Sequence, residues 1–142
     1  HLDLSGFAQV PSGTTVRAAL AQLRAERRNI CLITQDGQLQ GIFTDRDVLL
    51  RVVGVDGVLD GPIDHVMTRT PITIAPDAPA LEALSIMDEN HFRNLPVVDS
   101  QGKIIGDMTH QTIIDYLAAR YPVEVLNRPL QADRFPRKAE GG

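Results

Sequence analysis

The sequence is poor in cysteine and aromatic residues and has no long hydrophobic run. Of its 142 residues, Cys31 is the only cysteine, and aromatic side chains account for 4%. A single cysteine excludes an internal disulfide and a cysteine metal cluster, which favours a reducing, cytoplasmic location. Because no apolar stretch approaches the roughly 18 residues that cross a bilayer, we expect no membrane partner. The chain starts at His1 rather than at a methionine, so we expect the natural protein to extend further.

An excess of positive charge is also missing. The formal net charge is -4 and the pI is near 5.5, whereas nucleic-acid binders usually carry a basic surface, so we expect no nucleic-acid partner. His65, His91 and His110 lie in different segments without the spacing of metal ligands, and we expect no metal site. The sequence shows no nucleophile motif and no acid–base pair of carboxylates, which argues against an enzyme.

The chain does contain an internal repeat. Residues 30–44 align with residues 95–109 at a constant shift of 65 positions, which matches Gly41 with Gly106 and Thr44 with Thr109. Apolar residues upstream match at a shift of 64 positions, and we interpret the difference as a one-residue length change in the loop between them. Such self-similarity indicates two copies of one structural unit.

Each copy shows the same order of predicted elements. Apolar residues at helical spacing predict one helix from Val16 to Leu23, with Thr14 as its N-cap, and another over 81–87, with Pro79 in its first turn. The other predicted elements are extended pieces at 7–10 and 72–75, hairpins at 30–44 and 95–109, and second helices around 48–52 and 113–117. This order indicates an α+β fold of two β-α-β-β-α units. We assign residues 1–58 and 59–120 to the two units and residues 121–142 to a proline-containing tail.

Three motifs carry a resemblance to a known family. They are Gly41-Ile-Phe-Thr-Asp-Arg-Asp-Val48, Val66-Met-Thr-Arg-Thr-Pro-Ile-Thr-Ile-Ala-Pro-Asp77 and Phe92-Arg-Asn-Leu-Pro-Val-Val-Asp99. With them the chain resembles a tandem pair of cystathionine β-synthase (CBS) domains, often called a Bateman module, from about Phe7 to Leu117. The resemblance implies pseudo-two-fold symmetry between the repeats, with the sheets packed together and the helices outside. It also implies an adenine-nucleotide site, although some members bind adenosyl ligands or nothing.

Thr44 and Asp47 are the best candidates for contact with a ligand. They lie at a predicted strand-to-helix junction, where free backbone N–H groups attract anions. The threonine hydroxyl can donate to a phosphate, and a carboxylate that accepts two hydrogen bonds suits the neighbouring hydroxyls of a ribose. The same Thr-x-x-Asp spacing is also a capping arrangement, and the two roles are compatible.

The resemblance extends this site to both copies. It implies that the Thr44 segment faces the first strand of the other copy, that residues 71–73 flank the adenine, and that Arg93 reaches the phosphates. For Arg93, solvent exposure or a surface salt bridge is an equal alternative, and Arg46 either contacts phosphate or faces solvent or a dimer partner. The candidate ligand-binding residues are Ile42, Phe43, Thr44, Arg46, Asp47, Pro71, Ile72, Thr73, Phe92, Arg93 and Pro96.

The second copy departs from this pattern. Thr112 stands where the first copy has Asp47, so the ribose acceptor is missing, and Asp107 replaces the apolar residue beside the glycine. Thr109 is kept, and we take Arg28 as the counterpart of Arg93. We therefore expect one good site and one degenerate site that contains Arg28, Thr109 and Thr112.

These features predict a regulatory module that senses AMP, ADP or ATP. We expect it to signal occupancy through a change in conformation or in dimer packing, with no cofactor beyond the nucleotide and with Mg2+ as a candidate companion of the phosphates. We also expect a homodimer and an effector protein, whose identity the sequence leaves open. The alternative is a structural dimerisation module with a vestigial ligand site.

Overall fold

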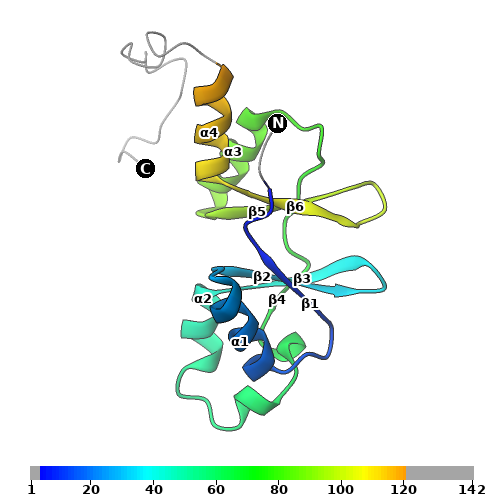
Figure 1. The fold of residues 1–142 in the computed structure, drawn as a ribbon, viewed down its shortest axis with the longest axis vertical. Helices are drawn as coiled ribbons and strands as arrows, with labels where there is room; N and C mark the ends of the chain where they lie inside the picture. The colour runs from blue at the N-terminus through cyan, green and yellow to red at the C-terminus, as the bar shows by residue number, and fades with distance from the viewer. Residues whose placement is uncertain (1–3, 121–142) are drawn as a thin grey trace.

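The structure, a computed structural model, describes residues 4–120 and consists of two β-sheets with helices on their outer sides. In Figure 1 the sheets lie one above the other, with α1 and α2 beyond one sheet and α3 and α4 beyond the other. In chain order the elements are β1 (Ala8–Pro11), α1 (Val16–Glu26), β2 (Ile30–Gln35), β3 (Gln38–Thr44), α2 (Asp45–Asp47), η1 (Val48–Val52), η2 (Val58–Asp60), η3 (Ile63–His65), β4 (Thr68–Arg69), α3 (Ala80–Asn90), β5 (Asn94–Val98), β6 (Ile104–Thr109) and α4 (His110–Arg120). The predicted α+β fold is confirmed, and the predicted tail at 121–142 lies outside the described residues.

Helix α1 begins at Val16, as predicted, but its N-cap lies one residue later than the sequence predicts. Thr15 is its N-cap, and the Thr15 side chain accepts a hydrogen bond from the backbone N–H of Ala18 at 3.1 Å. The prediction of Thr14 as the cap is wrong, because the Thr14 hydroxyl donates to the carbonyl of Pro11 at 2.7 Å. In the second repeat the sequence predicts Pro79 in the first turn of the helix. In the structure Pro79 is the N-cap of α3, and the first turn begins at the next residue.

The ends of the first helices show which positions of the two repeats are equivalent. Helices α1 and α3 both end on a left-handed residue, Arg27 and His91 respectively, and these lie 64 positions apart. Strands β2 and β5 begin the same number of residues after these helix ends, at Ile30 and Asn94. Ile30 pairs with Thr44, and Asn94 pairs in the same way with Thr109. The first strands therefore correspond at a shift of 64, and the predicted shift of 65 is wrong for them.

The one-residue difference lies in the hairpin turns. Asp36 and Gly37, both at positive φ, join β2 to β3 in two residues, as expected for a type I′ turn. The second hairpin uses residues 100–102, because the backbone N–H of Asp99 donates to the carbonyl of Lys103 at 2.9 Å. Arg28 is consequently equivalent to Phe92, and its predicted equivalence to Arg93 is wrong.

The extended piece predicted at 72–75 is reduced to one bridge between Ile74 and Val97. Ile74 donates its N–H to the carbonyl of Pro96 and accepts from the N–H of Val98, both at 3.0 Å. A parallel ladder would next use the N–H of residue 96, which a proline lacks. In the first repeat, by contrast, β1 pairs with β2 over four residues.

The repeats exchange the segments that lead into them. Strand β4 leads into the second repeat but pairs with β3 of the first, where Ile42 lies opposite Thr68. In return, the backbone N–H of Asp107 on β6 donates to the carbonyl of Leu4 at 2.9 Å. The Leu4 segment leads into the first repeat, so a segment of each repeat bonds to the edge of the other repeat's sheet.

A glycine allows each exchange. A Cβ atom at Gly41 would lie 2.4 Å from the Met67 sulfur, and one at Gly106 would lie 2.3 Å from the Leu4 Cβ atom and 2.7 Å from the Leu4 carbonyl oxygen. The interpretation that these glycines permit close backbone approach is therefore confirmed for Gly106, whereas Gly41 makes room for the side chain of Met67.

Each repeat has its own core between its sheet and its helices. Phe43 and Cys31 are fully buried in the first core, together with residues 63, 66 and 67 of the segment that precedes the second repeat. Burial raises the pKa of the Cys31 thiol to about 12, so this residue is a buried small hydrophobe, as expected. Met87 and Leu95 are fully buried in the second core.

The substitution Gly106→Ala should lower the free energy of unfolding by about 1–3 kcal/mol, because the added methyl group meets the backbone of Leu4. Gly41→Ala should cost less, since the side chain of Met67 can turn away. Gly61→Ala is the control, because its Cβ atom would lie at an ordinary 3.5 Å from its nearest neighbour. Urea unfolding of the three variants tests this order, and equal stabilities would contradict it.

Candidate functional site

Most of the predicted ligand-binding residues meet at a cleft between the repeats, which we call the first cleft. Its larger part has a volume of about 300 Å³ and is lined by Thr44, Asp45, Arg46, Leu49, His91, Phe92, Arg93 and Asn94. Its smaller part, the apolar slot, has a volume of about 140 Å³ and is lined by Ile42, Thr68, Thr70, Pro71, Ile72, Phe92, Asn94 and Pro96. Phe92 and Asn94 line both parts, so the slot adjoins the larger part.

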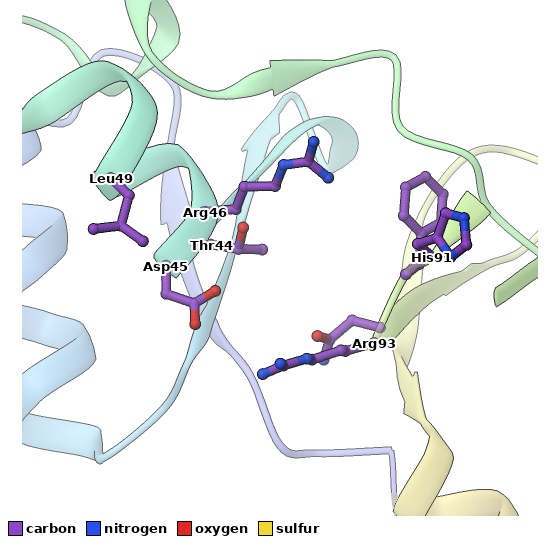
Figure 2. Close-up of a pocket in the computed structure, with 8 residues that line it drawn as sticks. Thr44, Asp45, Arg46, Leu49, His91 and Arg93 are labelled. Atoms are coloured by element: carbon purple, nitrogen blue, oxygen red, sulfur yellow. The ribbon is translucent and has the colours of Figure 1, made fainter. Parts of the chain in front are cut away.

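Arginine side chains enter the larger part from both repeats. Figure 2 shows Arg46 extending from α2 above Thr44, and Arg93 extending from the loop between α3 and β5 toward the side of Asp45. Within residues 4–120, neither guanidinium group has a hydrogen-bond or ion-pair partner. Two unpaired guanidinium groups in one concave site favour an anionic ligand.

Asp47 lies behind the wall of the cleft and is only 5% exposed. One carboxylate oxygen accepts hydrogen bonds from the backbone N–H of Thr44 at 2.9 Å and from the Thr44 hydroxyl at 3.4 Å. The other accepts from the Thr68 hydroxyl at 2.9 Å and lies 3.7 Å from a guanidinium nitrogen of Arg51. Asp47 thus has the capping role that the sequence left as an alternative, and it also ties β3 to β4.

Arg51 fixes the same region from η1, which is a π-helix where the sequence predicts a regular helix. One of its guanidinium nitrogens donates to the carbonyls of Val66 at 3.2 Å and Met67 at 2.8 Å. Asp47, Thr68 and Arg51 therefore form one connected group at the place where the chain crosses from the first repeat to the second.

Sequence reasoning identified only part of this site. The structure brings together Ile42, Thr44, Arg46, Pro71, Ile72, Phe92, Arg93 and Pro96 as lining residues. Phe43 points into the core of the first repeat, and Thr73 lines neither part of the cleft. Six further lining residues were not predicted: Asp45, Leu49, Thr68, Thr70, His91 and Asn94. Their only signal was a position within or near the three family motifs.

The predicted residues of the second site are divided. Arg28 and Thr109 line a separate cleft. The Thr112 hydroxyl is engaged locally, because it donates to the carbonyl of Thr109 at 2.7 Å and accepts from the Thr109 N–H at 2.8 Å. Thr112 therefore caps α4 as Asp47 caps α2, without a carboxylate.

Asp107 lies between the two sites and is 1% exposed. One of its carboxylate oxygens accepts a hydrogen bond from the side-chain amide of Asn94 at 2.6 Å, and the other has no partner among the described residues. Burial raises the pKa of Asp107 to about 7, although the hydrogen bond from Asn94 acts in the opposite direction. This acid is the second-repeat counterpart of Ile42, and its partner Asn94 lines both parts of the first cleft.

Within residues 4–120, no group of three or more histidine, cysteine, aspartate or glutamate residues could hold a metal ion. None of the helices in this part of the chain has the length and apolar character needed to span a membrane.

Comparison with known proteins gives a consistent family and fold. The profile of the CBS domain family matches residues 5–54 and 63–119. The chain is 42% identical over 108 residues to a CBS domain-containing protein of Arabidopsis thaliana, an alignment that covers 74% of this chain and 19% of the plant protein. It therefore spans about a fifth of the length of that relative.

Solved structures share the fold. A CBS domain protein from Pyrobaculum aerophilum complexed with AMP gives a TM-score of 0.68 at 24% identity, with 79% of this chain and 91% of that chain covered. The cytosolic domain of the Mg2+ channel MgtE in complex with ATP gives a TM-score of 0.69 at 23% identity, with coverages of 81% and 46%.

Asp107→Asn should remove a pH-dependent loss of stability. Because the folded protein raises the Asp107 pKa from 3.8 to about 7, it binds more protons than the unfolded chain between those values, and the free energy of unfolding falls as pH rises through this window. The variant should gain at most about 4 kcal/mol over the wild type at pH 8, and the gain should vanish near pH 4. Asp36→Asn, in the exposed turn, controls for the lost charge. The free energy of unfolding is measured in urea at several pH values. A difference between wild type and Asp107→Asn that stays constant from pH 4 to pH 8 would contradict this account.

Proposed function

The chain belongs to the CBS domain family, and on that premise we propose that it is a regulatory module that binds an adenine nucleotide in the first cleft. The observation that carries the proposal is that the apolar slot adjoins the part that holds Arg46 and Arg93 and shares Phe92 and Asn94 with it. A flat base requires apolar walls, and phosphates require cationic donors, so one elongated cleft meets both needs of a nucleotide.

The proposed ligand lies along the cleft with its base in the slot. Ile42 on β3 and the segment Pro71-Ile72 cover the base, and Pro96 closes the end of the slot. The ribose lies at the junction of the two parts beside Thr44, and the phosphates face Arg46 and Arg93. Mg2+ can accompany the phosphates, for which oxygen ligands are available on the nucleotide itself.

Asp47 is proposed to accept from the ribose hydroxyls. Its carboxylate has about four acceptor positions, and the three protein donors include one long contact, the 3.4 Å hydrogen bond from the Thr44 hydroxyl. That hydroxyl can turn from Asp47 to the ligand, because the backbone N–H of Thr44 keeps the carboxylate in place at 2.9 Å. The cap and the ligand contact can therefore coexist.

The cleft also suits the transmission of a signal. Its walls belong to both repeats, so a ligand that contacts Thr44 and Arg93 together favours one arrangement of the repeats over others. We propose that an effector protein, or another part of a longer chain, responds to this arrangement in the cytoplasm. The proposal treats the chain as a binding module rather than an enzyme. Proteins of similar fold have been solved with AMP and with ATP.

Thermal unfolding with AMP, ADP and ATP tests the nucleotide site. A ligand at 100 times its Kd stabilises the folded state by about 2.7 kcal/mol, and Tm should rise by about 5–10 °C. Asp47→Ala should abolish most of this rise. Thr112→Ala is the matched control, because it removes the equivalent cap of α4 at a similar cost of about 0.5–2 kcal/mol and should leave the rise intact. A wild-type Tm that ignores all three nucleotides would exclude the proposed function.

A structural role in dimerisation is the second candidate, and exposed apolar side chains favour it. On and after η1, Leu50 is 67% exposed and Val53 is 62% exposed. These side chains lie outside both parts of the first cleft. A homodimer that covers them would remove this apolar surface from water.

Light scattering tests the dimer. The wild type should have twice the chain mass, and Leu50→Glu should shift it to the monomer mass, because a buried unpaired carboxylate is costly. Gln35→Glu adds the same charge at the exposed hairpin end and should remain dimeric. A monomeric wild type would contradict this prediction, whereas a dimer that shows no thermal shift with any nucleotide would favour a purely structural role.

A further inference from the structure

A second cleft lies on the other side of Arg93, and we call it the basic cleft. Its volume is about 490 Å³, and its lining includes Arg27, Arg28, Arg93, Thr109 and His110. Among the described residues, Asp45 is the only carboxylate that lines it. Arg93, Asp45 and Asn94 line this cleft and the first cleft alike. The two clefts therefore adjoin across a shared wall.

The basic cleft is the pseudo-two-fold counterpart of the larger part of the first cleft. Thr109 corresponds to Thr44, and His110 corresponds to Asp45, at a shift of 65. In the other wall, where the shift is 64, Arg27 corresponds to His91 and Arg28 to Phe92. At these three positions the basic cleft has a guanidinium in place of an imidazole, a guanidinium in place of an aromatic ring, and an imidazole in place of a carboxylate.

The counterpart of the apolar slot is closed. Its walls would be formed by Ile30, Leu32 and Asp107, which correspond to Asn94, Pro96 and Ile42. All three are at most 1% exposed, so within residues 4–120 there is no opening for a base beside the basic cleft. The aromatic ring of Phe92 is also replaced, by the guanidinium of Arg28.

The ribose acceptor is absent as well. Thr112 occupies the position of Asp47, and its hydroxyl is engaged with the backbone of Thr109 through two hydrogen bonds, at 2.7 and 2.8 Å. The features that would recognise a nucleoside are therefore lost, whereas the features that attract an anion are increased.

The cations of the basic cleft are unpaired. Among the described residues, the guanidinium groups of Arg27, Arg28 and Arg93 make no ion pair and donate no hydrogen bond. Three guanidinium groups around one concave space repel each other unless an anion lies between them, and the planar guanidinium fork matches phosphate oxygens two at a time.

We propose that the basic cleft is an oligophosphate site, which takes a diphosphate or triphosphate group and recognises no base or sugar. The site goes beyond the proposed nucleotide site, and its binding of free oligophosphate does not depend on that proposal. The phosphate groups can come from a free oligophosphate or from the tail of a nucleoside triphosphate whose base lies in the first cleft, since Arg93 borders both clefts. Recognition rests on the same guanidinium groups in either case.

Calorimetric titration of the full chain with pyrophosphate and tripolyphosphate, in magnesium-free buffer, tests the site. One oligophosphate should bind per chain, and Arg28→Ala should weaken binding at least about tenfold. Arg28→Gln, which keeps much of the side-chain stem, should give the same loss. Arg24→Ala is the control, because Arg24 lies in the last turn of α1, just before Arg28, and lines neither cleft. The affinity of this variant should equal that of the wild type.

Titrations with nucleotides distinguish the two sources. If free oligophosphate is the ligand, pyrophosphate binds equally well in saturating AMP, and Arg28→Ala leaves the affinities for AMP and ATP unchanged. If the tail of a triphosphate enters, Arg28→Ala weakens ATP and not AMP, and ATP blocks pyrophosphate. The proposal is overturned if neither oligophosphate nor ATP affinity responds to Arg28→Ala, or if adenosine competes with pyrophosphate for the basic cleft. AMP binding to the wild type reports separately on the first cleft.

Discussion

The exchange of lead-in segments between the repeats is the constraint on which both clefts depend. Gly106 leaves room for the backbone of Leu4 against β6, and Gly41 leaves room for the side chain of Met67, which comes just before β4. The Asp47–Thr68 hydrogen bond then fixes the first crossing at the end of β3. Residues from both repeats consequently meet along one line, and the clefts form where they meet.

A few side chains make the two clefts different within this symmetric frame. The replacement of Asp47 by Thr112 removes a carboxylate without removing the helix cap, because a threonine hydroxyl can also bond to the backbone of Thr109. At the position of Ile42, the second repeat has Asp107, and burial raises the pKa of this carboxyl to about 7. Because Asp107 is buried together with its neighbours, no space for a base is left beside it. The first cleft has an apolar slot, whereas the basic cleft has three arginines and no such slot among the described residues, so the same backbone supports two kinds of recognition.

The sequence predicted the fold largely through local signals. Helical spacing located the helices, and Asp36-Gly37 located a hairpin turn, since such patterns depend on neighbours in the chain. The exchange could not be predicted, because β4 has two residues and its partner in β3 lies far back in the sequence. The predicted equivalence of Arg28 and Arg93 was wrong because the alignment of Gly37 with Gly102 did not reveal the extra residue in the second hairpin turn. Knowledge of the CBS family supplied residues such as Pro71 and Pro96, whereas Arg27 and Asn94 emerged only from the three-dimensional arrangement.

The central claim is that one nucleotide lies between the repeats, with its base in the apolar slot and its ribose beside Asp47. A crystal structure of the chain grown with AMP tests it most directly. The account predicts electron density for the base between Ile42 and the segment Pro71-Ile72, with the phosphate near Arg93. Nucleotide density that appears only beside Thr109 and Thr112, with the first cleft empty, would contradict it.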